Sequence, residues 1–296
     1  MQAMFASDGY RVRQAVIRRW EVTVDSAEEG RTAMENAADS PDAAAGPGRR
    51  ARARERTWRE LRAAALEEVR EVGPSALALR SVARRLGMSP AGLYRYVESR
   101  DGLLTALIAD SYHDLADHLE VALGTPAEAL PARERPEPVV AVVAGAEAGG
   151  AARAIAVGLA YRAWSVRHPN EFGLLFGDPI PGYAAPQGGP TVDAMRRVGI
   201  ALARPFIEAA AGGHLHIDPV LRSPEVLGPP GVYDPMLPEG VDPALGPLLL
   251  LAWGRLHGQV SLEVFGHHHW LFPEGCEALL RADLERTLRD LRLLPG

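Results

Sequence analysis

The chain contains no lysine, and all 32 of its basic residues are arginine. We attribute this bias to a GC-rich genome; selection for bidentate phosphate contacts is the alternative. Cysteine is almost absent too, since Cys276 stands alone. A single cysteine excludes an intramolecular disulfide framework and a C-x-x-C metal or redox motif, and it fits a reducing cytoplasm.

Long hydrophobic runs are also missing. No stretch of 18 apolar residues occurs, so we expect no membrane-spanning helix. Charged residues interrupt the N-terminal region, so a secretory signal is not expected. Sustained period-two alternation is absent, which predicts an all-α fold.

Common catalytic motifs are absent as well. We find no G-x-S-x-G elbow, P-loop or H-E-x-x-H sequence. The expectation is therefore a cytoplasmic protein that is not an enzyme and carries no cofactor or metal.

Positive charge is concentrated in one segment. The chain has a net charge of -6, yet residues 49–100 contain thirteen Arg against six Glu, about +7, which leaves about -13 for the remainder. Such asymmetry predicts a nucleic-acid-binding portion joined to a second functional part.

The N-terminal region has little amphipathic pattern. Residues 1–48 are predicted to be a disordered extension, and the Ala/Pro/Gly-rich tail over 34–54 ends in a basic run. Met34 is an alternative start of the natural protein.

A compact set of helices is predicted over a DNA-binding domain at residues 49–113. Apolar spacing predicts helices over 57–71, 79–86, 90–97 and 100–119. Gly87 suits the left-handed position that ends a helix, and Ser89 and Ser99 suit N-caps. Two helices joined by a short glycine-containing turn, behind a packing helix, indicate a helix-turn-helix.

In this interpretation the helix after Ser89 enters the major groove of DNA. Leu93 and Val97 face the core, while small residues at its start allow close approach to base edges. Arginines and tyrosines supply phosphate and base contacts. The predicted DNA-binding residues are Arg80, Ser89, Pro90, Ala91, Gly92, Tyr94, Arg95, Tyr96 and Arg100.

The segment over residues 57–113 resembles the DNA-binding domain of the TetR family of bacterial transcriptional regulators. The matching elements are LRSVA (79–83), LGMS (86–89), LYRYV (93–97) and SRDGLL (99–104). One departure is Ala78, where the family usually places a Ser or Thr that caps the second helix. Alanine there should cost roughly 1 kcal/mol of local stability.

The remaining chain also reads as helical. Residues 114–150 are predicted to hold the end of the linking helix and a variable linker, and 151–296 a helical domain with helices over 151–167, 171–176, 191–211, 243–267 and 276–293. The runs WGRLHG (253–258) and YRAW (161–164) resemble a regulatory-domain subgroup of the same family. That resemblance implies a domain that binds an effector and dimerises.

Two site predictions follow for this domain. An effector pocket between helices is expected to be lined by Trp164, Phe172, Phe176, Trp253 and His257. A dimeric four-helix bundle, or else burial within one subunit, is expected for Gly254, Gly258, Ser261, Leu280, Leu284, Thr287 and Leu291.

The predicted function is a homodimeric regulator that binds double-stranded DNA at a palindromic operator, acts as a repressor and responds to a small-molecule effector. A regulator controlled by a protein partner is one alternative. A metal-dependent hydrolase that uses His267, His268 and His269 is another, although adjacent histidines on a helix point about 100° apart and do not easily share an ion.

Overall fold

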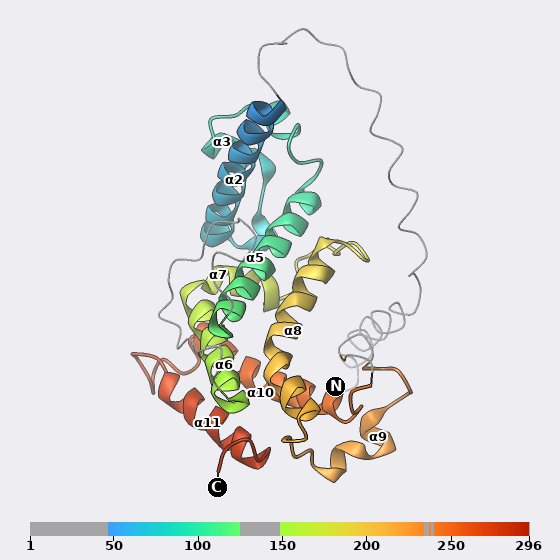
Figure 1. The fold of residues 1–296 in the computed structure, drawn as a ribbon. Helices are drawn as coiled ribbons and strands as arrows, with labels where there is room; N and C mark the ends of the chain where they lie inside the picture. Colours follow the sequence, from blue (N-terminus) through green and yellow to red (C-terminus); the bar gives the residue numbers. More distant parts are fainter. Residues whose placement is uncertain (1–46, 125–148, 234–236, 238–239, 296) are drawn as a thin grey trace, which may run out of the picture. The chain divides into compact units, whose positions relative to one another are not determined.

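The computed structural model describes residues 47–124, 149–233, 237 and 240–295, with side chains from Arg52 onward. Every regular element in this described part is a helix, which confirms the predicted all-α class (Figure 1). No helix in it has the length and apolarity needed to cross a membrane. The predictions for residues 1–46 and for the linker over 125–148 fall outside the described residues.

The first helix, α2 (Pro47–Val72), is longer than the predicted 57–71. It starts within the predicted polar tail, because the Arg- and Ala-rich sequence there consists of good helix formers. Gly73, at a positive φ of 81°, and Pro74 end it. Leu61, Ala65 and Val69 form its buried face.

The helix-turn-helix consists of α3 (Leu79–Arg85) and α4 (Pro90–Leu93). Gly87 has φ 62°, as predicted for the residue that ends α3. Ser89 caps α4, since its Oγ accepts a hydrogen bond from the Gly92 amide at 3.1 Å. The predicted helix over 90–97 is therefore shorter, and turn residues 94–96 follow before α5.

The central helix is α5 (Arg100–Ala122), capped by Ser99, whose Oγ accepts from the Gly102 amide at 3.0 Å. It contacts α6 (Gly150–Arg167), α7 (Pro169–Phe176) and α8 (Pro190–Ala211). Figure 1 shows α5 running from the region of α2 and α3 into the helices of the C-terminal domain. One apolar core continues from Leu61 on α2 through α5 to Leu280.

The chain closes with α10 (Leu245–Val264) and α11 (Glu277–Asp290), and both helices pack on α6. A second apolar cluster joins the end of α8 and the start of α10 to the segment that holds η4 (Pro219–Arg222) and α9 (Pro224–Leu227). Tyr233 lies so close to the backbone of Gly246 that a side chain there would collide with its ring. Glycine is therefore required where this segment crosses α10.

Candidate nucleic-acid interface and regulatory core

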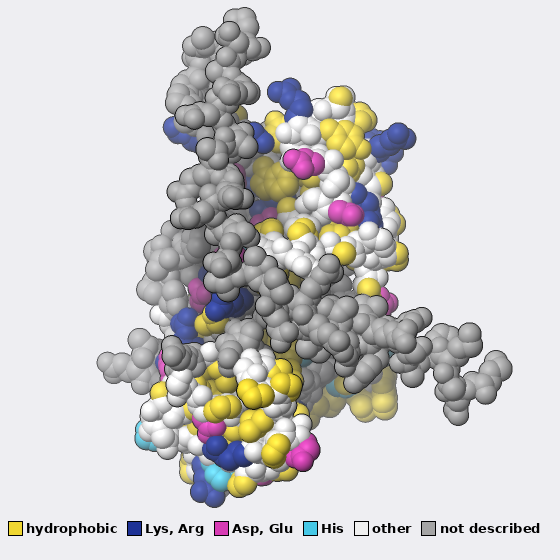
Figure 2. Space-filling view, turned by 90° about the vertical axis from the view of Figure 1, so that its right-hand side faces the viewer, with side chains coloured by type: hydrophobic (Ala, Val, Ile, Leu, Met, Phe, Trp, Pro, Cys, Tyr) yellow, Lys and Arg dark blue, Asp and Glu magenta, His cyan; other side chains and the backbone are white. Residues whose placement is uncertain are grey.

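The recognition surface is an exposed face on a rigid apolar base. Leu93 and Val97 are buried, at 0% and 4% exposure, which agrees with their predicted direction. The polar and small residues around them lie on the outside, and these are Arg80, Ser89, Pro90, Ala91, Tyr94 and Arg95. Figure 2 shows several arginine side chains on the upper part of the visible face and others lower on it.

Two arginines on this surface are available for a ligand. The guanidinium groups of Arg80 and Arg95 make no ion pair or side-chain hydrogen bond with another described residue. Tyr94 is 55% exposed, whereas Tyr96 is half-buried and packs against the core. The sequence interpretation missed Arg84, an exposed neighbour whose Nη2 donates to Ser81 Oγ at 3.0 Å.

Arg100, one of the predicted DNA-binding residues, is hydrogen-bonded within the fold. Its Nε donates to the Leu77 carbonyl at 2.9 Å, and its Nη2 donates to the carbonyls of Pro74 and Ser75 at 3.0 and 2.8 Å. These carbonyls belong to the short segment that connects α2 to α3. The guanidinium therefore acts as a brace between the start of α5 and the segment before α3.

A second contact fixes α3 on α2. Arg85 Nε donates to Glu68 Oε2 at 2.8 Å, and Arg85 also pairs with Glu71. Hydrogen bonds from Ser81 and Arg85 lower the pKa of the buried Glu68 carboxyl. The recognition helix is consequently held by a scaffold whose buried charge is paired.

An aromatic cluster occupies the core of the C-terminal domain. It consists of Tyr161, Phe172, Phe176, Trp253 and His257, and its rings contact one another at centroid distances of 4.9–6.4 Å. Four of these residues were predicted to line an effector pocket. Here their rings pack against one another, with Phe172 buried and Phe176, Trp253 and His257 half-buried.

Trp164, the fifth predicted pocket residue, has a different role. It is fully buried, packs on His168 at 5.2 Å and donates Nε1–H to Asp114 Oδ2 at 2.6 Å. This contact ties α6 to α5. Its indole N–H is therefore already satisfied within the fold.

The aromatic cluster contains one polar chain. The Tyr161 hydroxyl and His257 Nδ1 are 2.8 Å apart, and His257 Nε2 lies 3.3 Å from Ser261 Oγ. Burial lowers the pKa of His257 and raises the pKa of Tyr161 far above its usual range. Both groups therefore favour their neutral forms, which suits a contact with an uncharged or aromatic molecule.

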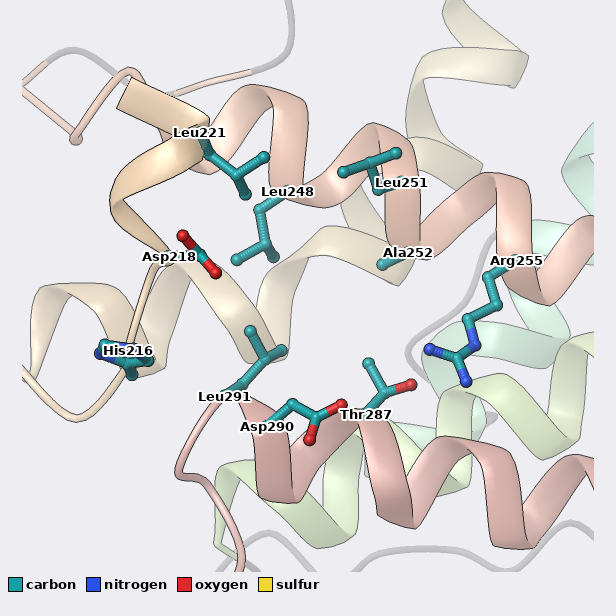
Figure 3. A pocket seen from close by; sticks show the side chains of 10 residues that line it. All are labelled: His216, Asp218, Leu221, Leu248, Leu251, Ala252, Arg255, Thr287, Asp290 and Leu291. Carbon is teal, nitrogen blue, oxygen red and sulfur yellow. The ribbon is translucent and has the colours of Figure 1, made fainter. Parts of the chain in front are cut away.

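A separate cavity of about 260 Å³ lies between the first half of α10 and the C-terminal end of α11 (Figure 3). Leucines form part of its wall, and polar groups are set among them. Its lining residues are His216, Asp218, Leu221, Leu248, Leu251, Ala252, Arg255, Thr287, Asp290 and Leu291. Arg255 is already paired with Asp283, to which its Nε donates at 2.7 Å.

Part of the predicted dimer surface packs inside the subunit, which was the alternative to a dimer interface. Leu280 is 2% exposed, and Leu284 packs on α6, where a Cβ added to Gly158 would lie 2.9 Å from its Cδ1. Leu291 packs against the second apolar cluster. Leu280 is therefore buried within the subunit, and Leu284 and Leu291 are half-buried against neighbouring helices of the same chain.

The part of the predicted dimer surface that lies on α10 is open. A Cβ at Gly254 or Gly258 would meet nothing within 4 Å. Exposed apolar side chains occur on the same two helices, and they are Leu251 and Leu262 on α10, Phe265 at its C-cap and Leu279 on α11. We call these four leucine and phenylalanine side chains, with Gly254 and Gly258, the α10–α11 face.

One alternative placed a metal site at His267, His268 and His269. No group of three His, Cys, Asp or Glu residues within the described ranges is arranged to hold a metal ion. Cys276, near His268, is buried, and burial with the Glu263 carboxylate raises the pKa of its thiol to about 11. The hydrolase alternative is therefore not supported.

A capped helix-turn-helix on a rigid base, joined through one long helix to an all-helical domain, defines the class of helix-turn-helix transcriptional regulators. Comparison with known proteins agrees. A family model described as "Bacterial regulatory proteins, tetR family" matches residues 61–107, and one described as "Tetracyclin repressor-like, C-terminal domain" matches residues 154–287.

Individual relatives give the same assignment. The HTH-type transcriptional regulators Rv1816 of Mycobacterium tuberculosis and Mb1846 of Mycobacterium bovis are each 32% identical over 228 residues, which span 75% of this chain and 86% of each relative. The chain belongs to the TetR family of bacterial regulatory proteins, and it is a DNA-binding transcriptional regulator.

Solved structures share the fold. The crystal structure of SCO4313 is 28% identical, covers 83% of this chain and 98% of its own, and superposes with a TM-score of 0.59. A protein of unknown function from Rhodococcus sp. RHA1, at 23% identity, covers 79% of this chain and 95% of its own with a TM-score of 0.54.

Proposed function

We propose that the protein is a homodimeric repressor that binds a palindromic operator in the cytoplasm and is released by a small-molecule effector. The observation that carries the DNA-binding part is that Arg80 and Arg95, beside the exposed start of α4, pair with no other described residue. Such guanidinium groups next to small side chains suit contacts to phosphates and guanine edges.

The first experiment is selection of bound duplexes from a random DNA pool at fixed salt. We expect a two-fold-symmetric site with half-sites about one helical turn apart. Arg95→Ala should weaken binding and relax base preference. Selection of no sequence above background would remove operator binding from the proposal.

The α10–α11 face supports dimerisation. Leu251 is 63% exposed and Leu262 is 43% exposed, and Gly254 and Gly258 between them leave room for a helix to approach closely. Two such faces together can form a four-helix bundle. Leu262→Glu should convert a dimer in analytical ultracentrifugation to a monomer, while Arg289→Glu, at an exposed position outside this face, should not.

The aromatic cluster supports the effector part. Displaceable rings around the Tyr161–His257 hydrogen bond offer apolar contacts and one polar contact. Thermal-shift screening tests this directly. A compound that raises the melting temperature and weakens operator binding supports the proposal; loss of its effect in Phe176→Ala would place it in the aromatic cluster. A hit whose effect survives in that variant binds elsewhere.

A further inference from the structure

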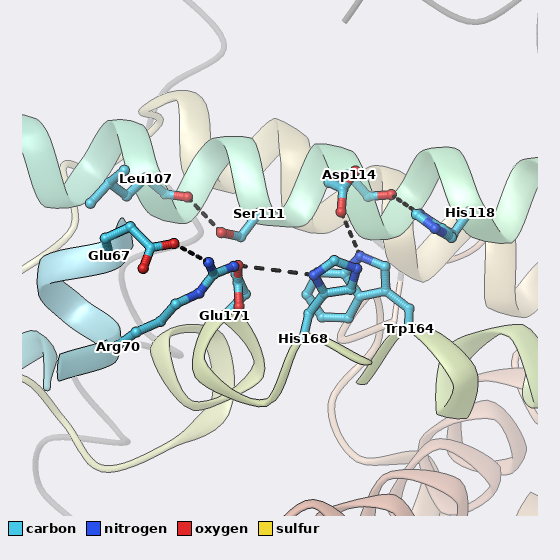
Figure 4. Close-up of polar contacts among 9 residues, drawn as sticks. All are labelled: Glu67, Arg70, Leu107, Ser111, Asp114, His118, Trp164, His168 and Glu171. Atoms are coloured by element: carbon cyan, nitrogen blue, oxygen red, sulfur yellow. Dashed lines mark hydrogen bonds and ion pairs between the residues drawn. The ribbon is translucent and has the colours of Figure 1, made fainter. Parts of the chain in front are cut away.

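The short helix α7 has two different partners on adjacent residues. Glu171 reaches α2 of the DNA-binding unit, and the next residue, Phe172, belongs to the aromatic cluster. Figure 4 shows Arg70 extending from α2 to the Glu171 carboxylate, with α5 alongside. The same eight-residue helix therefore touches both functional parts of the chain.

The contact on the α2 side is an ion pair with one buried partner. Arg70 Nη2 donates to Glu171 Oε1 at 2.7 Å. Glu171 is only 6% exposed, and its buried Oε2 has no hydrogen-bond partner in the described part of the chain. Arg70 is more exposed and also pairs with Glu67 on its own helix. The buried carboxylate depends on this guanidinium, so the pair constrains the distance between the two helices.

A neighbouring face of α7 packs against aromatic rings. The ring centroids of Phe172 and Phe176 lie 5.6 and 4.9 Å from that of His257. The Phe176 ring centroid also lies 5.9 Å from that of Trp253. A helix of this length moves as a unit when one of its side chains is displaced, because its backbone hydrogen bonds resist local deformation. Because Glu171 and Phe172 are adjacent, a shift of the α7 backbone at Phe172 also shifts Glu171.

The start of α7 is anchored, which limits how it can move. His168 packs on Trp164, whose Nε1–H is held by Asp114 of α5, and His168 Nδ1 lies 3.9 Å from Glu171 Oε1 (Figure 4). The start of α7 is thus tied to α5 and α6. Its end also contacts α5, because the centroids of the Phe176 and Tyr112 rings are 5.9 Å apart.

We propose that the Arg70–Glu171 pair couples the aromatic cluster to the DNA-binding unit: a molecule that displaces Phe172 or Phe176 rotates α7, breaks the pair and releases α2. The coupling rests on the proposed function, because it assigns a consequence to occupation of the aromatic cluster. A ligand shifts the equilibrium only if it binds the state with the broken pair more tightly than the state with the intact pair.

A mutation can replace the unidentified effector in the test. Phe176→Leu changes the packing of α7 without touching the recognition surface. We expect it to change the operator Kd, measured by fluorescence anisotropy on the selected duplex, by about 2- to 30-fold in the wild-type background. In a Glu171→Gln background the same substitution should change Kd less than about twofold, because the ion pair has been reduced to a neutral hydrogen bond.

Glu67→Gln is the matched control, since it removes the other carboxylate on Arg70 while leaving the α2–α7 contact. The full effect of Phe176→Leu should persist in that background. An equal effect in the Glu171→Gln and Glu67→Gln backgrounds, or no effect of Phe176→Leu in any background, would overturn the proposal. In the double variant Arg70→Glu with Glu171→Arg, which reverses the pair, Phe176→Leu should again change the operator Kd as it does in the wild type.

A readout without DNA separates this proposal from the proposed function. Hydrogen exchange of the α2 amides in residues 60–72 should become faster with Phe176→Leu in the wild-type and Glu67→Gln proteins. In Glu171→Gln it should already be fast and change little further. If the protein selects no operator, the proposed function fails, and the exchange pattern still decides whether α7 is coupled to α2. Equal acceleration by Phe176→Leu in all backgrounds would refute the coupling.

Discussion

Replacing Arg100 with alanine should destabilise the protein without removing a phosphate contact. The side chain makes three hydrogen bonds to the carbonyls of Leu77, Pro74 and Ser75. Hydrogen bonds from charged donors contribute about 1.5–3 kcal/mol each when buried. Here the side chain is 28% exposed and water can replace it at Ser75, so we expect the free energy of unfolding to fall by about 2–3 kcal/mol in total.

This destabilisation can be measured alongside DNA affinity. For a domain of this size it corresponds to a fall in melting temperature of roughly 4–12 °C. The salt dependence of operator binding should keep its slope, because removal of a single phosphate contact would reduce that slope by about 0.9. Arg95→Ala is the comparison: its exposed side chain should change stability by less than about 0.5 kcal/mol and should reduce the slope.

Arg100→Ala and Arg95→Ala are thus expected to differ: the first lowers the melting temperature, and the second lowers the salt slope. If Arg100→Ala keeps the wild-type melting temperature and lowers the salt slope, the side chain contacts DNA and its assignment as a brace is wrong. Arg100→Lys provides a finer check, since a single ammonium cannot reach three carbonyls in the same geometry. It should fall between the wild type and the alanine variant in stability.

The remaining predictions concern single side chains. Ala78→Ser should raise the free energy of unfolding by about 1 kcal/mol in urea titration, because α3 lacks a side-chain cap; no gain would mean that the N-cap geometry is wrong. Tyr94→Phe should keep the melting temperature and weaken operator binding by about fivefold, and unchanged affinity would remove its hydroxyl from the interface. Cys276, with a thiol pKa of about 11, should react slowly with maleimide at about pH 8 in native protein and quickly in urea; fast native labelling would contradict its burial. The pKa of His257 is lowered from 6.5 by burial, so the unfolded state binds its proton first and stability should fall as the pH drops through about 6.5; the fall in melting temperature should be smaller in His257→Gln, and an equal fall would exclude His257 as a cause.

The DNA-binding unit could be predicted in detail because its signals are local. Gly87, Ser89 and Ser99 act within one helical turn of themselves, and the structure confirms each of them. Burial of Leu93 and Val97 follows from their spacing of four residues. Helix boundaries were less accurate: the Arg-rich segment before Thr57 is helical, and the recognition helix ends at Leu93.

Predictions that required a partner from a distant element were weaker. Arg100 was assigned to phosphate by its position, but the carbonyls it binds are 23–26 residues earlier in the chain. Leu280 and Leu284 belong to an apolar stripe that suited either a dimer or an internal core. In the structure Leu284 packs against α6, where Gly158 has no side chain to block it. The sequence had no signal for this choice, since both outcomes bury the same apolar stripe.

The sequence by itself determined the class of fold, the helix-turn-helix and its caps, because period, capping and turn chemistry depend on residues a few positions apart. Tertiary structure decided which of the described arginines are paired within the fold, and it placed Glu171 against Arg70, 101 residues earlier. The physical reason is that a charge is available for a ligand only when no folded partner reaches it. That partner is selected by packing, which no local pattern encodes.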